Sequence, residues 1–202
     1  MAYNNNLKRV IFGGDSNVGK TTFFMTHFLD YHEPQYIPIK VEDYITKEYT
    51  VGTEGEKVEV LFVDHEGGGE DWHRLRHLGY TYYFTSVIVL CFSISSIDTF
   101  ERIEEYWYPF AQKHCPTAKL VLLGMKKDLM NDEKILKELA KANEVPVAYE
   151  QGVEMAKRIG AVGYYECSSK LKEGFDEVCK AAAEAAFLVS SPTEKKKKCF
   201  LM

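Results

Sequence analysis

A glycine-rich segment near the start of the chain has the residue types of a phosphate-binding loop. Residues 14–21 read GDSNVGKT, which has the spacing GxxxxGK[ST], and they lie between an apolar run and a helix-like segment. In such a loop backbone N–H groups surround a phosphate, the lysine bridges phosphate oxygens, and the last hydroxyl binds Mg²⁺. The motif predicts phosphate binding, with Lys20 as the catalytic lysine and Thr21 as a metal ligand.

A carboxylate at the end of a later apolar run is a second candidate metal residue. Asp64 follows LFV and precedes His65, Glu66 and Gly67. An acid at the carboxyl end of a strand beside a phosphate loop is placed to contact Mg²⁺ through water. We therefore expect Asp64 to complete the metal site with Thr21.

Two further motifs indicate a guanine base. Lys126-Lys127-Asp128 follows the run LVLLG, and residues 166–170 read ECSSK. An aspartate can accept two hydrogen bonds from the N1–H and exocyclic amine of guanine, a pattern that adenine does not offer. The stem of Lys126 can cover the base, and a backbone N–H of the second motif can donate to the guanine carbonyl.

The last residues carry a candidate lipidation signal. Lys195–Lys198 precede Cys199-Phe200-Leu201-Met202, which has the form of a prenylation motif. Methionine in the last position favours farnesyl, although geranylgeranyl remains open. One lipid chain anchors a protein marginally, and each lysine near anionic lipid adds about 1 kcal/mol. This pattern predicts attachment at Cys199 to an anionic membrane surface.

Alternating strands and helices are expected to position these motifs. The central runs are fully apolar, as buried parallel strands are, and a turn-like GTEGE joins two alternating runs into an antiparallel hairpin. The pattern predicts an α/β fold with a doubly wound, mostly parallel six-stranded sheet, one antiparallel strand and helices on both faces. Strands are expected at 7–13, 44–51, 58–64, 87–92, 120–123 and 164–167, with a weak strand at 146–148; helices are expected at 20–30, 98–114 with Asp98 as N-cap, 132–143, 151–159 and 174–189.

Composition is consistent with one intracellular domain and a tail. The 202 residues are 46% hydrophobic, which suffices for a core, and no signal peptide or spanning segment is visible. Five scattered cysteines without metal-ligand spacing indicate a reducing compartment, with Cys91 and Cys167 in buried strands. The net charge is −5, but Lys195–Lys198 contribute four positive charges and Glu194 one negative, so residues 1–193 carry −8. This acidic body disfavours nucleic-acid binding.

Taken together, the motifs resemble those of a Rho/Rac-type small GTPase of the Ras superfamily over roughly residues 7–202. The segment Tyr36-Ile37-Pro38 resembles the first switch of that family, and Arg74-Leu75-Arg76 with Tyr80 resembles the second. A charged helix at about 132–143 stands where Rho proteins carry an insert helix. The resemblance implies a single P-loop GTPase domain at 7–189 and a flexible tail at 190–202.

The resemblance also implies ligands, partners and location. It implies a monomeric signalling switch that binds GTP or GDP with Mg²⁺. The implied partners are exchange factors, activating proteins, a dissociation inhibitor and effectors. The implied role is in the actin cytoskeleton, and the implied location is the cytoplasmic face of the plasma or another membrane with a cytosolic pool. Bound GDP is the expected occupant. The implied nucleotide contacts are Ser16, Asn17, Val18, Gly19, Lys20, Thr21, Thr22, His32, Gly67, Lys126, Asp128, Leu129, Ser168, Ser169 and Lys170.

Several residues depart from the family pattern. Ile39 stands where a threonine normally binds Mg²⁺, and residues 64–70 read DHEGGGE where the family has DTAGQE with its water-orienting glutamine. Glu66 brings a carboxylate that could either bind Mg²⁺ or repel phosphate. Ser16 and Met125 replace a usual glycine and a usual asparagine or threonine. We expect retained nucleotide binding, poor GTP hydrolysis and a loosely ordered first switch.

Three functional classes follow. The chain is a switch that cycles by hydrolysis, or a nucleotide-loaded, hydrolysis-deficient scaffold that does not cycle. A P-loop kinase or ATPase is disfavoured by Asp128 and by the absence of room for a lid domain.

Overall fold

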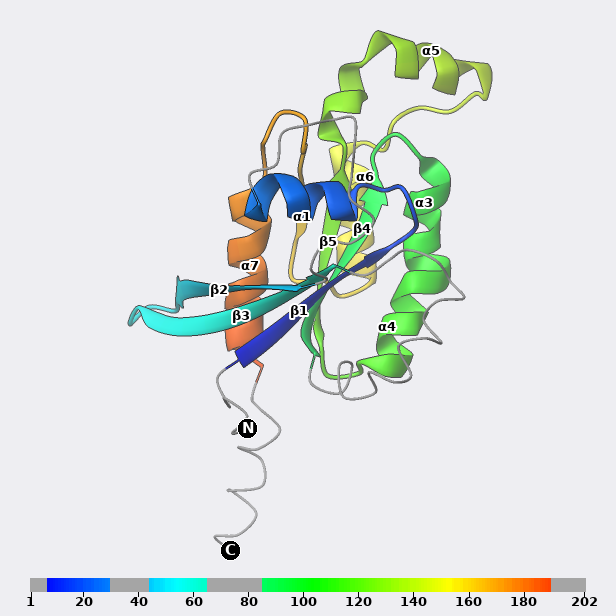
Figure 1. The fold of residues 1–202 in the computed structure, drawn as a ribbon. Helices are drawn as coiled ribbons and strands as arrows, with labels where there is room; N and C mark the ends of the chain where they lie inside the picture. The colour runs from blue at the N-terminus through cyan, green and yellow to red at the C-terminus, as the bar shows by residue number, and fades with distance from the viewer. Residues whose placement is uncertain (1–6, 30–43, 65–84, 190–202) are drawn as a thin grey trace, which may run out of the picture.

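A six-stranded sheet forms the centre of the protein. The computed structural model describes residues 7–29, 44–64 and 85–189. In this part of the chain the strand order is β2-β3-β1-β4-β5-β6, with β2 antiparallel to β3 and every other pair parallel. This architecture confirms the predicted mostly parallel α/β sheet with one antiparallel strand (Figure 1). The strands are β1 (Leu7–Gly14), β2 (Tyr44–Val51), β3 (Glu56–Asp64), β4 (Thr85–Ser93), β5 (Lys119–Met125) and β6 (Tyr164–Glu166).

Helices cover both faces of the sheet, as expected. Every residue of β4 is buried, and alternate side chains enter two separate cores. Val89 and Cys91 join the core beneath α1 and α7, whereas Leu90 and Phe92 join the core beneath α3, α4 and α6. Figure 1 shows α7 on the opposite side of the sheet from α3 and α4. The α-helices are α1 (Lys20–Phe28), α3 (Ile97–Arg102), α4 (Tyr108–His114), α5 (Glu133–Lys141), α6 (Tyr149–Arg158) and α7 (Phe175–Phe187).

The helix predicted at 98–114 is not continuous. A π-helical segment, Ile103–Trp107, separates α3 from α4. Pro109 lies in the first turn of α4, and proline has no N–H to donate and clashes with the carbonyl four residues earlier. The wider π turn directly before it accommodates both effects.

Two smaller predictions were wrong. The N-cap of α3 is Ser96, whose side chain accepts a hydrogen bond from Thr99 N, and Asp98 lies inside the first turn. Residues 146–148 form no strand: Pro146 has no N–H, and Val147 N makes a single hydrogen bond to Ile94 O. One such bond does not build a ladder.

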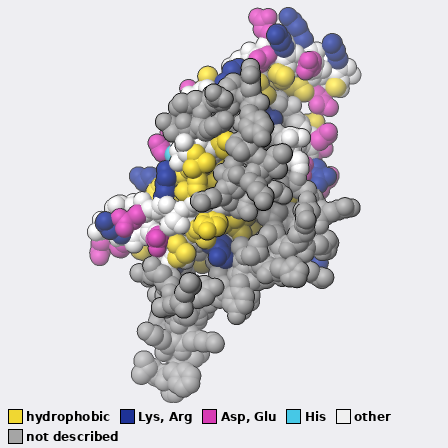
Figure 2. Space-filling view, in the orientation of Figure 1, with side chains coloured by type: hydrophobic (Ala, Val, Ile, Leu, Met, Phe, Trp, Pro, Cys, Tyr) yellow, Lys and Arg dark blue, Asp and Glu magenta, His cyan; other side chains and the backbone are white. Residues whose placement is uncertain are grey.

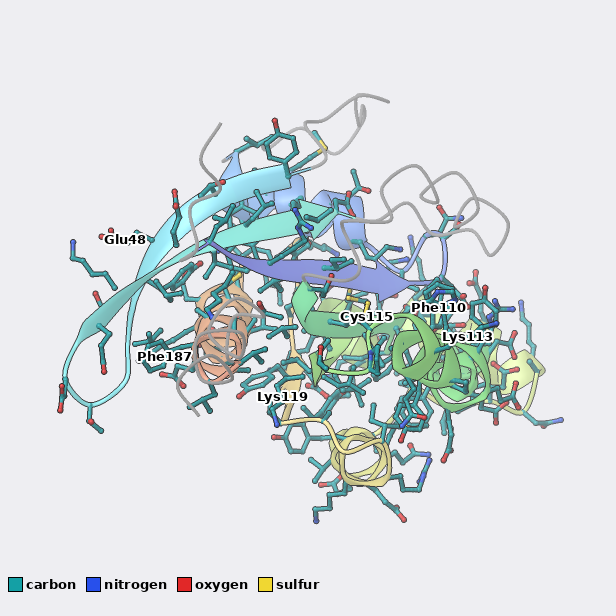
Figure 3. The ribbon with its side chains drawn as sticks, turned by 90° about the horizontal axis from the view of Figure 1, so that it is seen from below. Glu48, Phe110, Lys113, Cys115, Lys119 and Phe187 are labelled. Atoms are coloured by element: carbon teal, nitrogen blue, oxygen red, sulfur yellow. The ribbon has the colours of Figure 1, made fainter. Side chains whose placement is uncertain are left out.

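The helix expected at 132–143 forms as α5 and is capped by Asp132, which accepts hydrogen bonds from Lys134 N and Ile135 N. It has no buried residue. Figure 2 shows lysine and acidic side chains interspersed over it, at the top of the view. The β2–β3 hairpin projects past the helices in the view from below (Figure 3), with Glu48 at its outer edge paired to Lys57 at 2.7 Å.

Several predicted features lie outside the described residues. They are His32, Ile39, both switch segments, Glu66, Gly67–Gly69, Lys195–Lys198 and Cys199. Among the described helices, none has the length and apolar character needed to cross a bilayer. The four cysteines of the described ranges are buried thiols, as predicted for Cys91 and Cys167, although Cys167 follows the last residue of β6 and so does not lie in a strand.

Candidate functional site

The predicted phosphate loop connects β1 to α1 through a tight backbone turn. Gly14 has φ +153° at the end of β1, and a Cβ placed there would lie 2.2 Å from Cys91 O on the adjacent strand β4. Asn17 and Gly19 also have positive φ, at 63° and 114°. The loop therefore requires glycine at position 14 and returns the chain directly into the helix.

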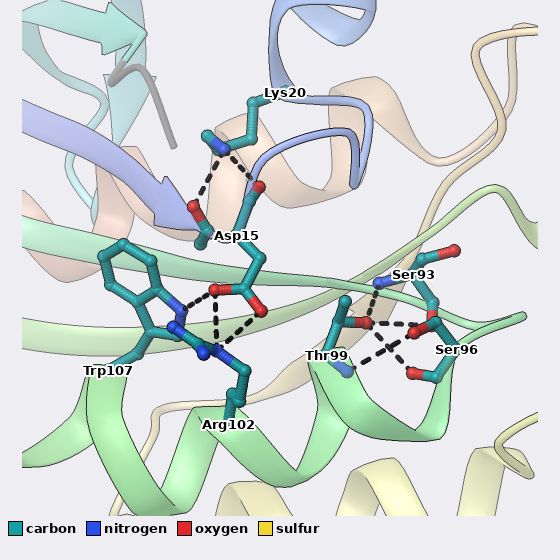
Figure 4. Close-up of polar contacts among 8 residues, drawn as sticks. Asp15, Lys20, Ser93, Ser96, Thr99, Arg102 and Trp107 are labelled. Atoms are coloured by element: carbon teal, nitrogen blue, oxygen red, sulfur yellow. Dashed lines mark hydrogen bonds and ion pairs between the residues drawn. The ribbon is translucent and has the colours of Figure 1, made fainter. Parts of the chain in front are cut away.

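Lys20 turns its ammonium group back into this loop. Its Nζ donates to Gly14 O at 2.9 Å and to Asp15 O at 2.8 Å (Figure 4). Burial lowers the pKa of Lys20 below its usual value, whereas Cys91, Asp64 and Asp15 act in the opposite direction. The first turn of α1 has no acidic residue and no side-chain cap, so its backbone N–H groups and Lys20 together form a site for an anion.

Thr21 and Asp64 lie together, as predicted for a metal site. The hydroxyl of Thr21, in the first turn of α1, donates to Asp64 Oδ2 at the end of β3 at 2.7 Å. Hydroxyl and carboxylate oxygens are the hard donors that Mg²⁺ prefers, so this pair fits that ion. The described ranges contain no cluster of three or more His, Cys, Asp or Glu residues that could hold a metal. Among the described residues, Thr21 and Asp64 are therefore the pair that would hold a magnesium ion.

The two predicted base-binding loops are tied together at the carboxyl ends of β5 and β6. Lys127 N donates to Cys167 O at 3.0 Å, and Cys167 N donates to Gly124 O at 2.9 Å. Lys126 takes a left-handed conformation with φ 59° and its side chain runs beside Gly19, whose added Cβ would lie 3.8 Å from Lys126 Cε. Burial lowers the pKa of Lys126, and Asp128 partly opposes this. The base loop thus contacts the phosphate loop.

Asp128 is held in place by Ser168. The serine is fully buried, and its hydroxyl donates to Asp128 Oδ1 at 2.6 Å while it accepts Leu171 N at 3.1 Å. The backbone N–H of Ser168 donates to Glu173 O at 3.0 Å. Ser168 therefore orients the carboxylate through its side chain, and its N–H is already paired with Glu173, so a backbone donor to a base from this motif would come from another residue.

The other predicted contacts surround these groups. The structure places Ser16 and Asn17 exposed at the top of the loop, Val18 buried in the core, Thr22 and Leu129 half-buried, Ser169 half-buried and Lys170 exposed. His32 and Gly67 lie outside the described residues.

One part of the site was missed by sequence reasoning. The carboxylate of Asp15 accepts a hydrogen bond from Trp107 Nε1 at 2.9 Å, and Arg102 Nε lies 2.9 Å from its Oδ2 (Figure 4). A carboxylate inside a loop that binds phosphate would repel the phosphate, so a nearby cation is expected to offset its charge. The sequence alone does not identify Arg102, 87 residues away, as that cation.

A sequence model of the Ras family matches residues 9–187, which include every described element of this site.

Proposed function

This chain belongs to the Ras family, so it is a small GTPase switch that binds GTP and GDP, generally with Mg²⁺, and we propose that it is a Rho/Rac-type member with impaired hydrolysis. The observation that carries the nucleotide assignment is the contact between Ser168 Oγ and Asp128 Oδ1. It fixes a carboxylate at the edge of the sheet where the phosphate loop also lies.

Each group of the site has a role in this proposal. The loop N–H groups and Lys20 bind phosphate oxygens, and the buried ammonium stabilises charge that develops on them. Thr21 and Asp64 hold Mg²⁺, which neutralises phosphate charge when bound. Asp128 reads the guanine edge, and Ser169 and Lys170 supply the backbone donors for its carbonyl.

The base assignment is tested by Asp128→Ala, with Lys127→Ala as the matched control. Two charge-assisted hydrogen bonds of about 1.5–3 kcal/mol each correspond to a loss of roughly 10²–10⁴ in GTP affinity. Affinity for ATP should not change, and Lys127→Ala should leave the preference for GTP intact because the side chain of Lys127 is exposed. A preserved GTP preference in Asp128→Ala would show that the base pocket is misplaced, and a wild-type preference for ATP would favour a kinase or ATPase.

The Rho/Rac assignment is supported by α5. This exposed helix lies between β5 and α6, and nothing in the domain core requires it, since none of its residues is buried. Binding to a Rho-type dissociation inhibitor, compared between the full chain and a variant in which a short linker replaces α5, tests the assignment. Failure of the full chain to bind any Rho-type regulator would contradict it.

Impaired hydrolysis is proposed from the sequence around both switches. Ile39 carries no side-chain oxygen for Mg²⁺, and glycine occupies Gly67–Gly69 in place of a water-orienting glutamine. The arginine-finger mechanism alone is worth about 10³–10⁵ in rate, so stimulated turnover should fall by several orders of magnitude. Single-turnover hydrolysis with and without an activating protein measures this, and an ordinary accelerated rate would refute the proposal.

The same residues favour a second candidate function, a nucleotide-loaded scaffold that does not cycle. A switch changes its effector affinity with the γ-phosphate, whereas a scaffold does not. Measuring partner binding to the GDP form and to a GTP-analogue form separates the two, because equal affinity supports the scaffold and unequal affinity supports the switch.

Membrane attachment is the final part of the proposal. Lys195–Lys198 would contact anionic lipid and Cys199 would carry a prenyl group, giving a cytoplasmic-face location with a cytosolic pool. Cys199→Ser should move the protein to the cytosolic fraction, and mass spectrometry should find the lipid on Cys199. Unchanged membrane fractionation of the variant would contradict the assignment.

A further inference from the structure

We propose that Arg102 and Trp107 are positioning residues for nucleotide binding, which hold the phosphate loop through Asp15, and that Arg102 cancels the charge of Asp15 beside the bound phosphates. This inference rests on the proposed nucleotide site.

Asp15 connects the phosphate-binding lysine to the opposite layer of the fold. Its carbonyl accepts a hydrogen bond from Lys20 Nζ at 2.8 Å, while its carboxylate accepts Trp107 Nε1 at 2.9 Å and pairs with Arg102. Figure 4 shows Arg102 and Trp107 reaching the carboxylate from the helix below the loop. Fixing the side chain of Asp15 therefore also fixes the carbonyl that orients Lys20.

The contacts are partly shielded from solvent. The Trp107 side chain is 1% exposed and that of Asp15 is 16% exposed, whereas Arg102 is 46% exposed. A hydrogen bond from a buried indole to a carboxylate holds one oxygen rigidly. The half-exposed guanidinium of Arg102 pairs with the carboxylate at 2.9 Å, and solvent makes the effect of its charge moderate.

The π-helical segment makes this arrangement geometrically possible. Residues 102 and 107 are five apart, and in an ideal α-helix they would point about 140° away from each other. A π turn bonds residue i to residue i+5, so it brings these two side chains toward one face. The structure has this turn over Ile103–Trp107 and both side chains reach the same carboxylate. Single π turns inside helices are frequent at functional sites.

The charge of Asp15 affects the relative affinity of the loop for GTP and GDP. An unpaired carboxylate in a loop that binds phosphates repels them, and GTP carries more negative charge than GDP. Removing Arg102 should therefore weaken binding of a GTP analogue more than binding of GDP. A role confined to packing would weaken both equally or affect only folding.

The experiment is a double-mutant cycle between Arg102→Gln and Asp15→Asn on the full chain. Dissociation constants for fluorescent GDP and a fluorescent non-hydrolysable GTP analogue are measured with Mg²⁺ present. Arg102→Gln should weaken the analogue about twofold to tenfold and GDP less. In the Asp15→Asn background, Arg102→Gln should have no further effect, because the repelling charge is gone.

The matched control is Arg158→Gln. Arg158 is 43% exposed and donates to Glu104 on the same π segment at 3.0 Å, and its other polar partners, Glu154 and Met155, lie on its own helix α6. It should leave both dissociation constants unchanged. Trp107→Phe keeps an aromatic ring at this buried position and removes the indole N–H that holds Asp15, so it should speed nucleotide release.

The outcomes separate this inference from the nucleotide site itself. If the wild-type chain binds no guanine nucleotide, the proposed function fails. If the wild-type chain binds and Arg102→Gln behaves like Arg158→Gln, or if Asp15→Asn does not suppress the effect of Arg102→Gln, the positioning role is refuted.

Discussion

Gly14 is the position where one added carbon should be most costly to both fold and site. In Gly14→Ala the new Cβ would lie 2.2 Å from Cys91 O and 3.0 Å from Cys91 C. These are backbone atoms of the paired central strand β4, so no rotamer change relieves the overlap. The ends of β1 and β4 must separate instead.

The expected size of the effect follows from two contributions. Overpacking in a close-packed core costs about 1–3 kcal/mol, and a positive φ on a residue with a Cβ adds about 1 kcal/mol. The free energy of unfolding of Gly14→Ala should therefore fall by about 2–4 kcal/mol. Because Gly14 O accepts the Lys20 ammonium, nucleotide affinity should fall with it.

Gly160 offers a matched control for the backbone contribution. It has φ +67°, and a Cβ built on it meets nothing within 4 Å. Gly160→Ala should cost about 1 kcal/mol and leave nucleotide binding intact. Urea denaturation of both variants without nucleotide measures the two costs. If Gly14→Ala is no more destabilised than Gly160→Ala, the close approach of the loop to β4 is refuted.

Three other perturbations probe separate contacts. Thr21→Ala removes the hydroxyl that contacts Asp64 and so weakens the proposed Mg²⁺ site. Removing Mg²⁺ with a chelator should therefore accelerate nucleotide release less in Thr21→Ala than in wild type or Thr21→Ser, as measured by stopped-flow fluorescence. Ser168→Ala leaves Asp128 without its buried donor and should weaken GTP roughly 10-fold or more, as measured by fluorescence titration, with Ser86→Ala, another buried serine, as control. Burial, aided by Lys47, lowers the pKa of His27. The unfolded chain therefore binds a proton that the folded chain resists, and stability should fall as the pH drops below about 6.5; His27→Phe should flatten this fall in pH-dependent denaturation.

Each of these expectations has a contradicting result. Equal chelator sensitivity in Thr21→Ala and Thr21→Ser would remove Thr21 from the metal site. Unchanged GTP affinity in Ser168→Ala would show that Asp128 needs no support. A pH profile of His27→Phe identical to that of wild type would assign the titration to another group.

The position of the motifs at one edge of the sheet was predictable, because parallel strands have their carboxyl ends on the same edge. Each motif follows an apolar run, and the structure brings all of them to that edge: residues 14–21, 64, 126–128 and 166–170. Helix interiors were harder to predict. The π-helical interruption at Ile103–Trp107 depends on how the chain accommodates Pro109, and the spacing of hydrophobic residues does not predict this.

Ser168 shows the same limit at the level of one residue. Its motif predicts a backbone donor to a base without saying which residue supplies it; in the structure the N–H of Ser168 pairs with Glu173 and its hydroxyl holds Asp128. Local sequence specifies that a serine follows the strand. Which of its polar groups remains available depends on the turn that brings Glu173 back beside it.

The sequence by itself identified the phosphate-loop motif, the pair Thr21 and Asp64, and Asp128 as the candidate residue for base recognition, because these chemistries need particular residue types at particular spacings. Only the tertiary structure decided that Asp15 is bound by Arg102 and Trp107, since those partners are 87 and 92 residues away and share a face only through a π turn. The physical reason is that spacing along the chain encodes local geometry, whereas a charge inside a loop is neutralised by whichever side chain the packing of distant elements brings to it.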